Sequence, residues 1–151
     1  MNCEAVMAPV KTQLYVEDPA GPAIDFMVEK HMGLVPVVDR ENHFVGLISG
    51  DRLTHFMLPP SLMMVKGAKR MSYLNEGREE IQERLDAIRA KPLGDLVDRD
   101  VKTTKPATPL ADALLMITEK QFVVPVVDDD GKLVGAISFF SMLHWLREVE
   151  T

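Results

Sequence analysis

Residues 35–49 read VPVVDRENHFVGLIS, and residues 124–138 read VPVVDDDGKLVGAIS. The two segments align without a gap at an offset of 89 residues, and nine of their fifteen positions are identical. The same offset pairs Phe56 with Trp145, so the similarity continues beyond the two quoted segments. Self-similarity at a fixed spacing is typical of chains built from repeated supersecondary units. We therefore expect two copies of one structural unit.

Each copy carries the pattern of a strand, a helix, a hairpin of two strands and a closing helix. Pro19 and Pro109 stand where a helix can begin, because proline lacks the N–H group that the first turn leaves unpaired. The apolar runs at 34–38 and 123–127 are too short for helices and rich in valine, which predicts strands buried on both faces. Turn-forming residues separate each run from a second apolar run, which predicts a hairpin in each copy.

Candidate first strands lie at residues 13–16 and 102–105, ahead of the helix in each copy. The sequence therefore predicts an α/β (α+β) fold with two β-α-β-β-α repeats. By chain order we expect a first repeat at 1–57, a helical insertion or linker at 58–91, and a second repeat at 92–151.

The insertion contains a predicted amphipathic helix at residues 75–90, with Ile81, Leu85 and Ile88 on one stripe. A helix with such a stripe needs a partner surface. That surface belongs to its own domain, to another subunit or to a target protein.

The composition excludes several classes of protein. The chain of 151 residues has a formal net charge of −6, which argues against binding to nucleic acid. No apolar stretch approaches the roughly 20 residues that span a bilayer, and the start lacks the pattern of a secretory signal, so we expect a cytoplasmic protein without a membrane partner. The single cysteine, Cys3, near a mobile terminus, is expected to have no role, and His31 and His43 have no neighbours at metal-ligand spacing. No nucleophile motif is present, so we expect no enzyme.

Taken together, the motif Leu110-Ala111-Asp112-Ala113, the methionine at 116 and the segment 124–138 resemble a tandem pair of cystathionine β-synthase type (CBS) domains. The resemblance implies that the two copies pack about a pseudo-twofold axis and leave two clefts between them. In this family such clefts often bind adenine nucleotides or adenosyl compounds, here AMP, ADP, ATP or S-adenosylmethionine as a regulatory ligand. No cofactor is required, and such pairs commonly form dimers.

The resemblance also implies binding residues at the end of the first strand, at the start of the second strand and after the third strand. In the second copy these are Thr103, Thr104, Val123, Val124, Pro125, Ser138 and Ser141. In the first copy they are Leu14, Tyr15, Leu34, Pro36, Ser49 and Arg52.

Two departures from the family pattern bear on the ligand. Many nucleotide-binding members carry an aspartate where this chain has Arg52 and Ser141, and phosphate-binding members often carry Arg or His where it has Leu34 and Val123. Asp51 is one residue away from the aspartate position, about 100° around a helix, and is expected to point elsewhere. Arg52 either binds a phosphate or carboxylate in the first cleft or lies on a solvated helix face. The hydroxyl groups of the second copy favour a neutral adenosine-like group there.

These features lead to two hypotheses. The first is a stand-alone CBS-pair regulatory module that binds a small ligand, an adenine nucleotide or related anion, and regulates an unknown protein target in trans. The alternative is a dimerisation or scaffold module without a ligand. Both include a homodimer, because the closing helices carry apolar faces, with Phe56 and Met57 in one copy and Trp145 and Leu146 in the other.

Overall fold

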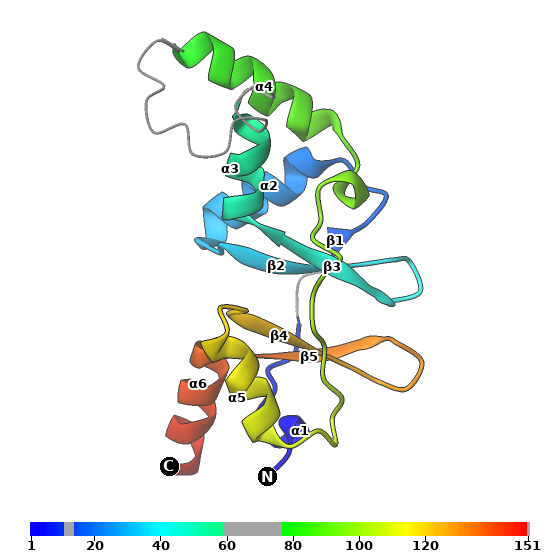
Figure 1. The fold of residues 1–151 in the computed structure, drawn as a ribbon, viewed down its shortest axis with the longest axis vertical. Coiled ribbons are helices and arrows are strands. Elements are labelled where there is room, and N and C mark those ends of the chain that lie inside the picture. The colour runs from blue at the N-terminus through cyan, green and yellow to red at the C-terminus, as the bar shows by residue number, and fades with distance from the viewer. Residues whose placement is uncertain (11–13, 59–76, 151) are drawn as a thin grey trace.

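The computed structural model describes residues 1–10, 14–58 and 77–150, and the side chains up to residue 148. In chain order the elements are α1 (Cys3–Val6), β1 (Leu14–Tyr15), α2 (Ala20–Lys30), β2 (Leu34–Val38), β3 (Phe44–Ser49), α3 (Gly50–Met57), α4 (Arg78–Ala90), the 3-10 turn η2 (Leu93–Asp95), α5 (Leu110–Thr118), β4 (Val123–Val127), β5 (Leu133–Ser138) and α6 (Phe139–Glu150). The predicted fold class of two β-α-β-β-α repeats is confirmed, and Figure 1 shows the repeats stacked with their sheets facing each other.

Both hairpins have the same register. In the first repeat β2 pairs antiparallel with β3, and β1 adds a parallel strand at Leu14 and Tyr15. In the second repeat β4 pairs with β5, but the expected first strand at 102–105 is reduced to one parallel bridge between Thr104 and Val126. At the start of this segment the backbone N–H and C=O of Lys102 both bond to the side chain of Gln121.

The hairpin turns bring the two repeats together. Asn42 and Gly131 occupy matching turn positions with φ of 67° and 81°, in the left-handed region that these two residue types tolerate. The Phe44 N–H donates to the Gly131 carbonyl at 3.0 Å, and the Leu133 N–H donates to the Asn42 carbonyl at 3.0 Å. This reciprocal pair of hydrogen bonds joins the two hairpin tips.

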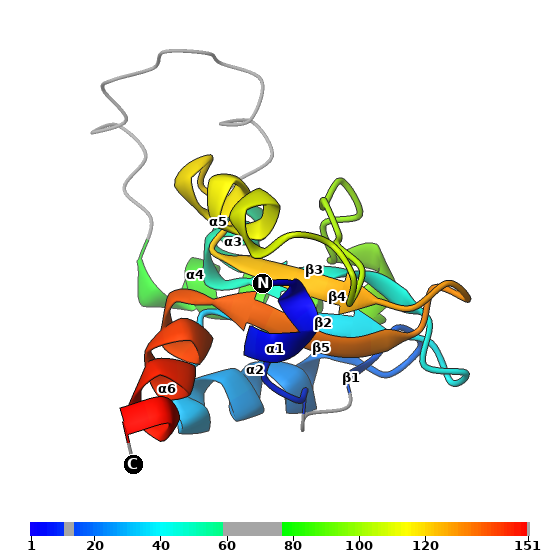
Figure 2. The same ribbon diagram turned by 90° about the horizontal axis from the view of Figure 1, so that it is seen from below.

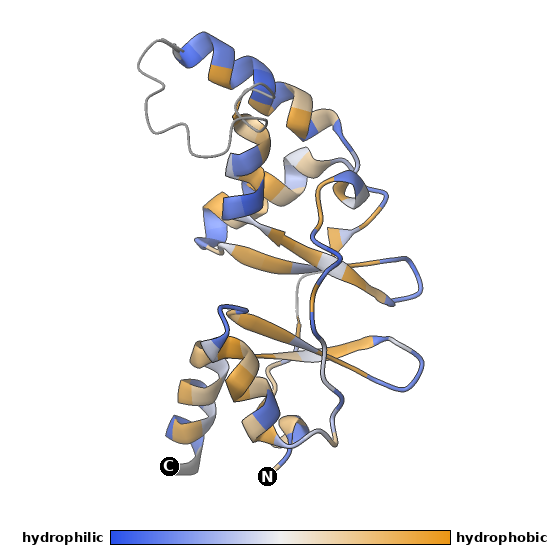
Figure 3. Cartoon of the chain, viewed as in Figure 1, coloured by the Kyte–Doolittle hydropathy of each residue, from blue (hydrophilic) through white to orange (hydrophobic). Residues whose placement is uncertain are grey.

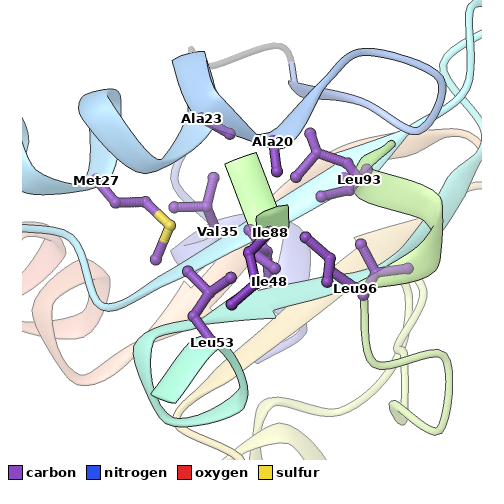
Figure 4. Close-up of a cluster of buried hydrophobic side chains, with 11 residues drawn as sticks. Ala20, Ala23, Met27, Val35, Ile48, Leu53, Ile88, Leu93 and Leu96 are labelled. Atoms are coloured by element: carbon purple, nitrogen blue, oxygen red, sulfur yellow. The ribbon is translucent and has the colours of Figure 1, made fainter. Parts of the chain in front are cut away.

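Two segments pack on the repeat to which chain order does not assign them. Residues 93–97 fill the first core, where Leu93 and Leu96 are buried against α2 and β3 (Figure 4). Residues 3–8 pack on the second repeat, with the Cys3 N–H donating to the Thr108 carbonyl at 2.9 Å. The predicted boundaries at 57 and 92 divide the chain by sequence order. In the structure, the first core includes residues from after position 92, and the second core includes residues from the start of the chain.

Cys3 is fully buried in the second core, contrary to the expectation of a mobile terminus. Burial raises the pKa of its thiol. Figure 2 shows α1 against the second repeat, where it contacts α5 and α6.

Helix α4 covers the first repeat, which answers the question of its partner surface. It contacts α2 and α3, and its Ile88 is only 3% exposed within the first core. Arg89 forms a bidentate pair with Asp25 of α2, with N···O distances of 2.8 and 3.0 Å. Phe56 and Met57, which were expected in a dimer contact, are partly buried and pack against the first core within the same chain.

None of the described helices combines the length and the apolar composition needed to cross a bilayer.

Candidate ligand-binding clefts

Two cavities lie between the repeats. We call the first the acidic cleft; it measures about 290 Å³ and is lined by Leu34, Leu47, Ser49, Asp51, Asp98, Asp100, Val101, Glu119, Lys120, Gln121 and Phe122. We call the second the aromatic cleft; it measures about 620 Å³ and is lined by His31, Met32, Gly33, Leu34, Ile117, Phe122, Val123, Ser138, Phe139 and Phe140.

The two clefts are repeat equivalents. At the offset of 89 residues, Ser49 of the acidic cleft corresponds to Ser138 of the aromatic cleft. Both serines end the third strand of their repeat and cap the closing helix, since each hydroxyl accepts the N–H of the residue three positions later. Across each cleft lies the segment that follows the other repeat's first helix, at 119–122 in one case and at 31–33 in the other.

One substitution changes the chemistry between these equivalent walls. Asp51, in the first turn of α3, corresponds to Phe140, in the first turn of α6. Both side chains line their cleft, so a carboxylate in one cleft is replaced by a phenyl ring in the other. Asp51, which was expected to point away from the position of the family's aspartate, is nevertheless among the residues that line the acidic cleft.

Charge separates the clefts further. Among its described lining residues the acidic cleft has four that are acidic, Asp51, Asp98, Asp100 and Glu119, and one that is basic, Lys120. Such a surplus of negative charge repels a phosphate group. Within the described part of the chain, no three His, Cys, Asp or Glu side chains are placed to hold a metal ion.

The aromatic cleft has no carboxylate among its described lining residues. Its three phenylalanines are exposed, Phe122 by 63%, Phe139 by 59% and Phe140 by 78%. The rings of Phe139 and Phe140 meet edge to face at 5.7 Å between centroids. Exposed aromatic faces of this kind are suited to stack on a planar base.

Of the site residues predicted for the first copy, the structure brings together Leu34 and Ser49 in the acidic cleft. Leu14 lies in β1 opposite Val37, and Pro36 is buried opposite Leu47. The Tyr15 ring is covered by the Arg40 guanidinium, 3.9 Å from its centroid.

Arg52 does not line the acidic cleft. Its Nε donates to the Leu96 carbonyl at 2.6 Å, and its guanidinium carbon lies 5.6 Å from the centre of the Phe56 ring. We expected Arg52 to favour an anion in the first cleft. Its side chain does not reach that cleft, and the acidic residues of the cleft oppose an anion.

In the second copy, Val123 and Ser138 come together in the aromatic cleft. Five further predicted residues lie outside its described wall: Thr103, Thr104, Val124, Pro125 and Ser141. Val124 and Pro125 are fully buried, and Thr104 is held by the Pro125 carbonyl, which accepts both its N–H and its hydroxyl. Sequence reasoning missed the phenylalanines and Asp51, although the repeat offset already paired Asp51 with Phe140.

A family model described as the CBS domain matches residues 4–58 and 93–148. The chain belongs to the CBS domain family. Among curated proteins it is 29% identical over 138 residues to the CBS domain-containing protein CBSX1, chloroplastic, and 28% identical over 138 residues to CBSX2, chloroplastic, both from Arabidopsis thaliana. Each match covers 85% of this chain and 57% or 54% of the relative, so the chain spans about half the length of these proteins.

Solved structures share the CBS-pair fold. CBSX2 in complex with AMP matches with a TM-score of 0.70 and 22% identity, over 99% of this chain and 98% of the other. CbpB in complex with c-di-AMP matches with a TM-score of 0.68 and 15% identity, over 99% of this chain and 87% of the other.

Proposed function

We propose that this chain is a regulatory CBS pair that binds an adenine nucleotide or adenosyl compound in the aromatic cleft and regulates a partner protein in trans. The observation that carries the proposal is the cavity of about 620 Å³ between the repeats, with exposed phenyl rings and the hydroxyl-bearing Ser138 in its wall. Binding cavities for small molecules have this character, with apolar walls and a few polar groups that set orientation.

The wall of the aromatic cleft suits a regulatory ligand because both repeats contribute to it. His31 to Leu34 come from the first repeat, whereas Phe122, Val123 and the start of α6 come from the second. A ligand seated there contacts both halves at once and favours one arrangement of the repeats over others. Among proteins of the same fold, CBSX2 has been solved with AMP and CbpB with c-di-AMP.

The choice of the aromatic cleft over the acidic cleft rests on charge. An adenine nucleotide carries phosphate, which four carboxylic side chains in the acidic cleft oppose. The aromatic cleft offers His31 and no carboxylate among its described residues. We therefore expect one nucleotide per chain rather than two.

A thermal-shift screen with AMP, ADP, ATP, S-adenosylmethionine and cyclic di-AMP tests the proposal. A ligand at 100 times its Kd adds about 2.7 kcal/mol to the folded state, which for a chain of this size raises the Tm by about 5–11 °C. Phe140→Ala should weaken binding, whereas the matched change Asp51→Ala in the acidic cleft should not. Calorimetry then gives the stoichiometry. The absence of any shift at millimolar concentration would reject nucleotide binding and leave the scaffold alternative.

The scaffold alternative and the proposed homodimer rest on the second repeat, where α5 and α6 expose apolar side chains. Leu115 is 60% exposed, Leu143 37% and Leu146 47%. Light scattering at micromolar concentration tests the dimer, and Leu146→Glu should dissociate it. A monomeric wild-type protein would contradict this part of the proposal.

A further inference from the structure

A third cavity lies away from both clefts, between the start of the chain and α6. We call it the N-terminal cavity. It measures about 410 Å³ and is lined by residues 5–9 together with Ser141, His144, Trp145 and Glu148. It shares no lining residue with the acidic cleft or the aromatic cleft.

The first repeat has an equivalent place, because residues 3–8 repeat the packing of residues 93–98. The Met7 N–H donates to the Cys3 carbonyl at 2.9 Å, just as the Val97 N–H donates to the Leu93 carbonyl at 3.1 Å. The next residue, Ala8 or Asp98, exchanges two backbone hydrogen bonds with the third strand of its repeat. In this correspondence the carbonyl of Leu96 matches that of Val6.

In the first repeat this place is occupied by the side chain of Arg52. Its Nε donates to the Leu96 carbonyl at 2.6 Å, and its guanidinium carbon lies 5.6 Å from the centre of the Phe56 ring. The guanidinium group therefore sits between a backbone carbonyl and an aromatic ring.

In the second repeat Ser141 replaces Arg52, and its hydroxyl turns back to the helix start. It donates to the Ser138 carbonyl at 3.0 Å and accepts the Ser138 N–H at 2.9 Å. The aromatic wall becomes Trp145, the side chain that binds cations most strongly through its π face. Glu148 adds a carboxylate, paired with His144 at 3.1 Å. The second repeat thus keeps the walls of a guanidinium site, and no arginine is among the described residues that line it.

We propose that the N-terminal cavity binds the guanidinium group of an external molecule in the place that Arg52 fills in the first repeat. The planar cation stacks on the Trp145 ring, donates to backbone carbonyls of residues 5–9 and lies near the Glu148 carboxylate. This site shares no lining residue with the aromatic cleft. The guanidinium belongs either to a small compound such as agmatine or to an arginine side chain.

The chain provides its own reporter, because Trp145 is its only tryptophan. Titration with methylguanidine or agmatine should change the tryptophan fluorescence to saturation, and methylurea, the neutral analogue, should not. A blocked arginine dipeptide is the second arm: tighter binding of agmatine indicates a small compound, and tighter binding of the dipeptide indicates an arginine side chain. Trp145→Leu should weaken agmatine binding about fivefold to tenfold by calorimetry.

The matched variant Ser141→Arg supplies the missing group from the chain itself. It should abolish the fluorescence titration. A response equal to that of methylurea, or a titration that persists in Ser141→Arg, would overturn the proposal.

The converse variant, Arg52→Ala, keeps the test decisive if Ser141→Arg does not fold. It opens the equivalent cavity in the first repeat, so methylguanidine should raise its Tm more than that of the wild type. Equal effects of methylguanidine and methylurea on this variant would likewise reject the site.

Discussion

The two repeats share most of their hairpin sequence, yet matched positions in them have different neighbours. Arg52 fills a space in the first repeat that Ser141 leaves open in the second, and Asp51 places a carboxylate where Phe140 places a ring. Helix α4 covers the first repeat, whereas the four-residue α1 covers the second. Figure 3 shows the difference in colour, with α4 largely hydrophilic and α6 carrying hydrophobic bands. The comparison teaches that the same backbone unit can have a space filled by one of its own side chains in one copy and a cavity in the other.

The largest expected difference between the repeats concerns their matched glycines, Gly46 and Gly135. A Cβ at Gly46 would collide with the backbone carbonyl of Asp98, which cannot move without breaking its pairing with Leu47. A Cβ at Gly135 would meet the side chain of Met7, at 2.8 Å from its Sδ, 2.9 Å from its Cγ and 3.0 Å from its Cβ, so Met7 must shift, but none of these three nearest atoms belongs to the backbone. We expect Gly46→Ala to cost about 3 kcal/mol or more, and Gly135→Ala about 1 kcal/mol. Urea denaturation measures both, and equal losses would contradict the comparison.

The second prediction tests whether α4 is part of the first core. Ile88→Ala removes a side chain that is 3% exposed, so the cavity left behind should cost about 2–4 kcal/mol. The control is Ile81→Ala on the same helix, where the side chain is 40% exposed and the loss should stay within about 0.5 kcal/mol. Similar losses for both variants, measured by chemical denaturation, would show that α4 does not contribute to the core.

The third prediction concerns the space that the Arg52 side chain fills in the first repeat. Arg52→Ala removes a charge-assisted hydrogen bond to the Leu96 carbonyl and a contact with the Phe56 ring. Because Arg52 is half-buried, the loss should be about 1–2 kcal/mol, below the full value for a buried charged donor. The conservative variant Arg52→Lys should recover only part of it, because lysine lacks the planar fork. Full recovery would show that charge alone matters there.

The smallest expected effect is at Asp25, where the pair with Arg89 joins α2 to α4. Hydrogen bonds from the Arg89 guanidinium lower the pKa of the Asp25 carboxyl. A carboxyl with a lowered pKa stabilises the folded state above its unfolded pKa of about 3.9, and the effect is lost as the pH falls through the folded pKa. Asp25→Asn should therefore lower the Tm slightly at neutral pH and leave it unchanged in strong acid. A constant difference at all pH values would contradict this origin.

The sequence alone predicted the parts of the fold that repeat. The hairpins and their turns carry local sequence signals. The family pattern also predicted four residues that line the clefts: Leu34, Ser49, Val123 and Ser138. Local patterns say less about segments whose partners lie far along the chain. Nothing near Cys3 indicates that its N–H bonds to Thr108, because that contact depends on how the finished repeats pack.

The direction of side chains was the second feature that the sequence did not predict. The repeat offset placed Arg52 opposite Ser141 but did not say that Arg52 turns toward the Leu96 carbonyl. That direction depends on residues 93–98 lying against the first repeat, which a comparison of the two copies by chain order does not reveal.

The packing of residues 3–8 on the second repeat also sets an order for biosynthesis. A ribosome releases the chain from its N-terminus, and the first core is complete once Val97 has emerged. The segment at 3–8 must then wait without its partner until β5 and its Ala136 have been made. A nascent chain halted between these points therefore carries every residue of the first core and an N-terminal segment, the strap, whose partner has not been made. For that interval, the strap and its buried Cys3 are open to chaperones and to oxidants that the finished fold excludes.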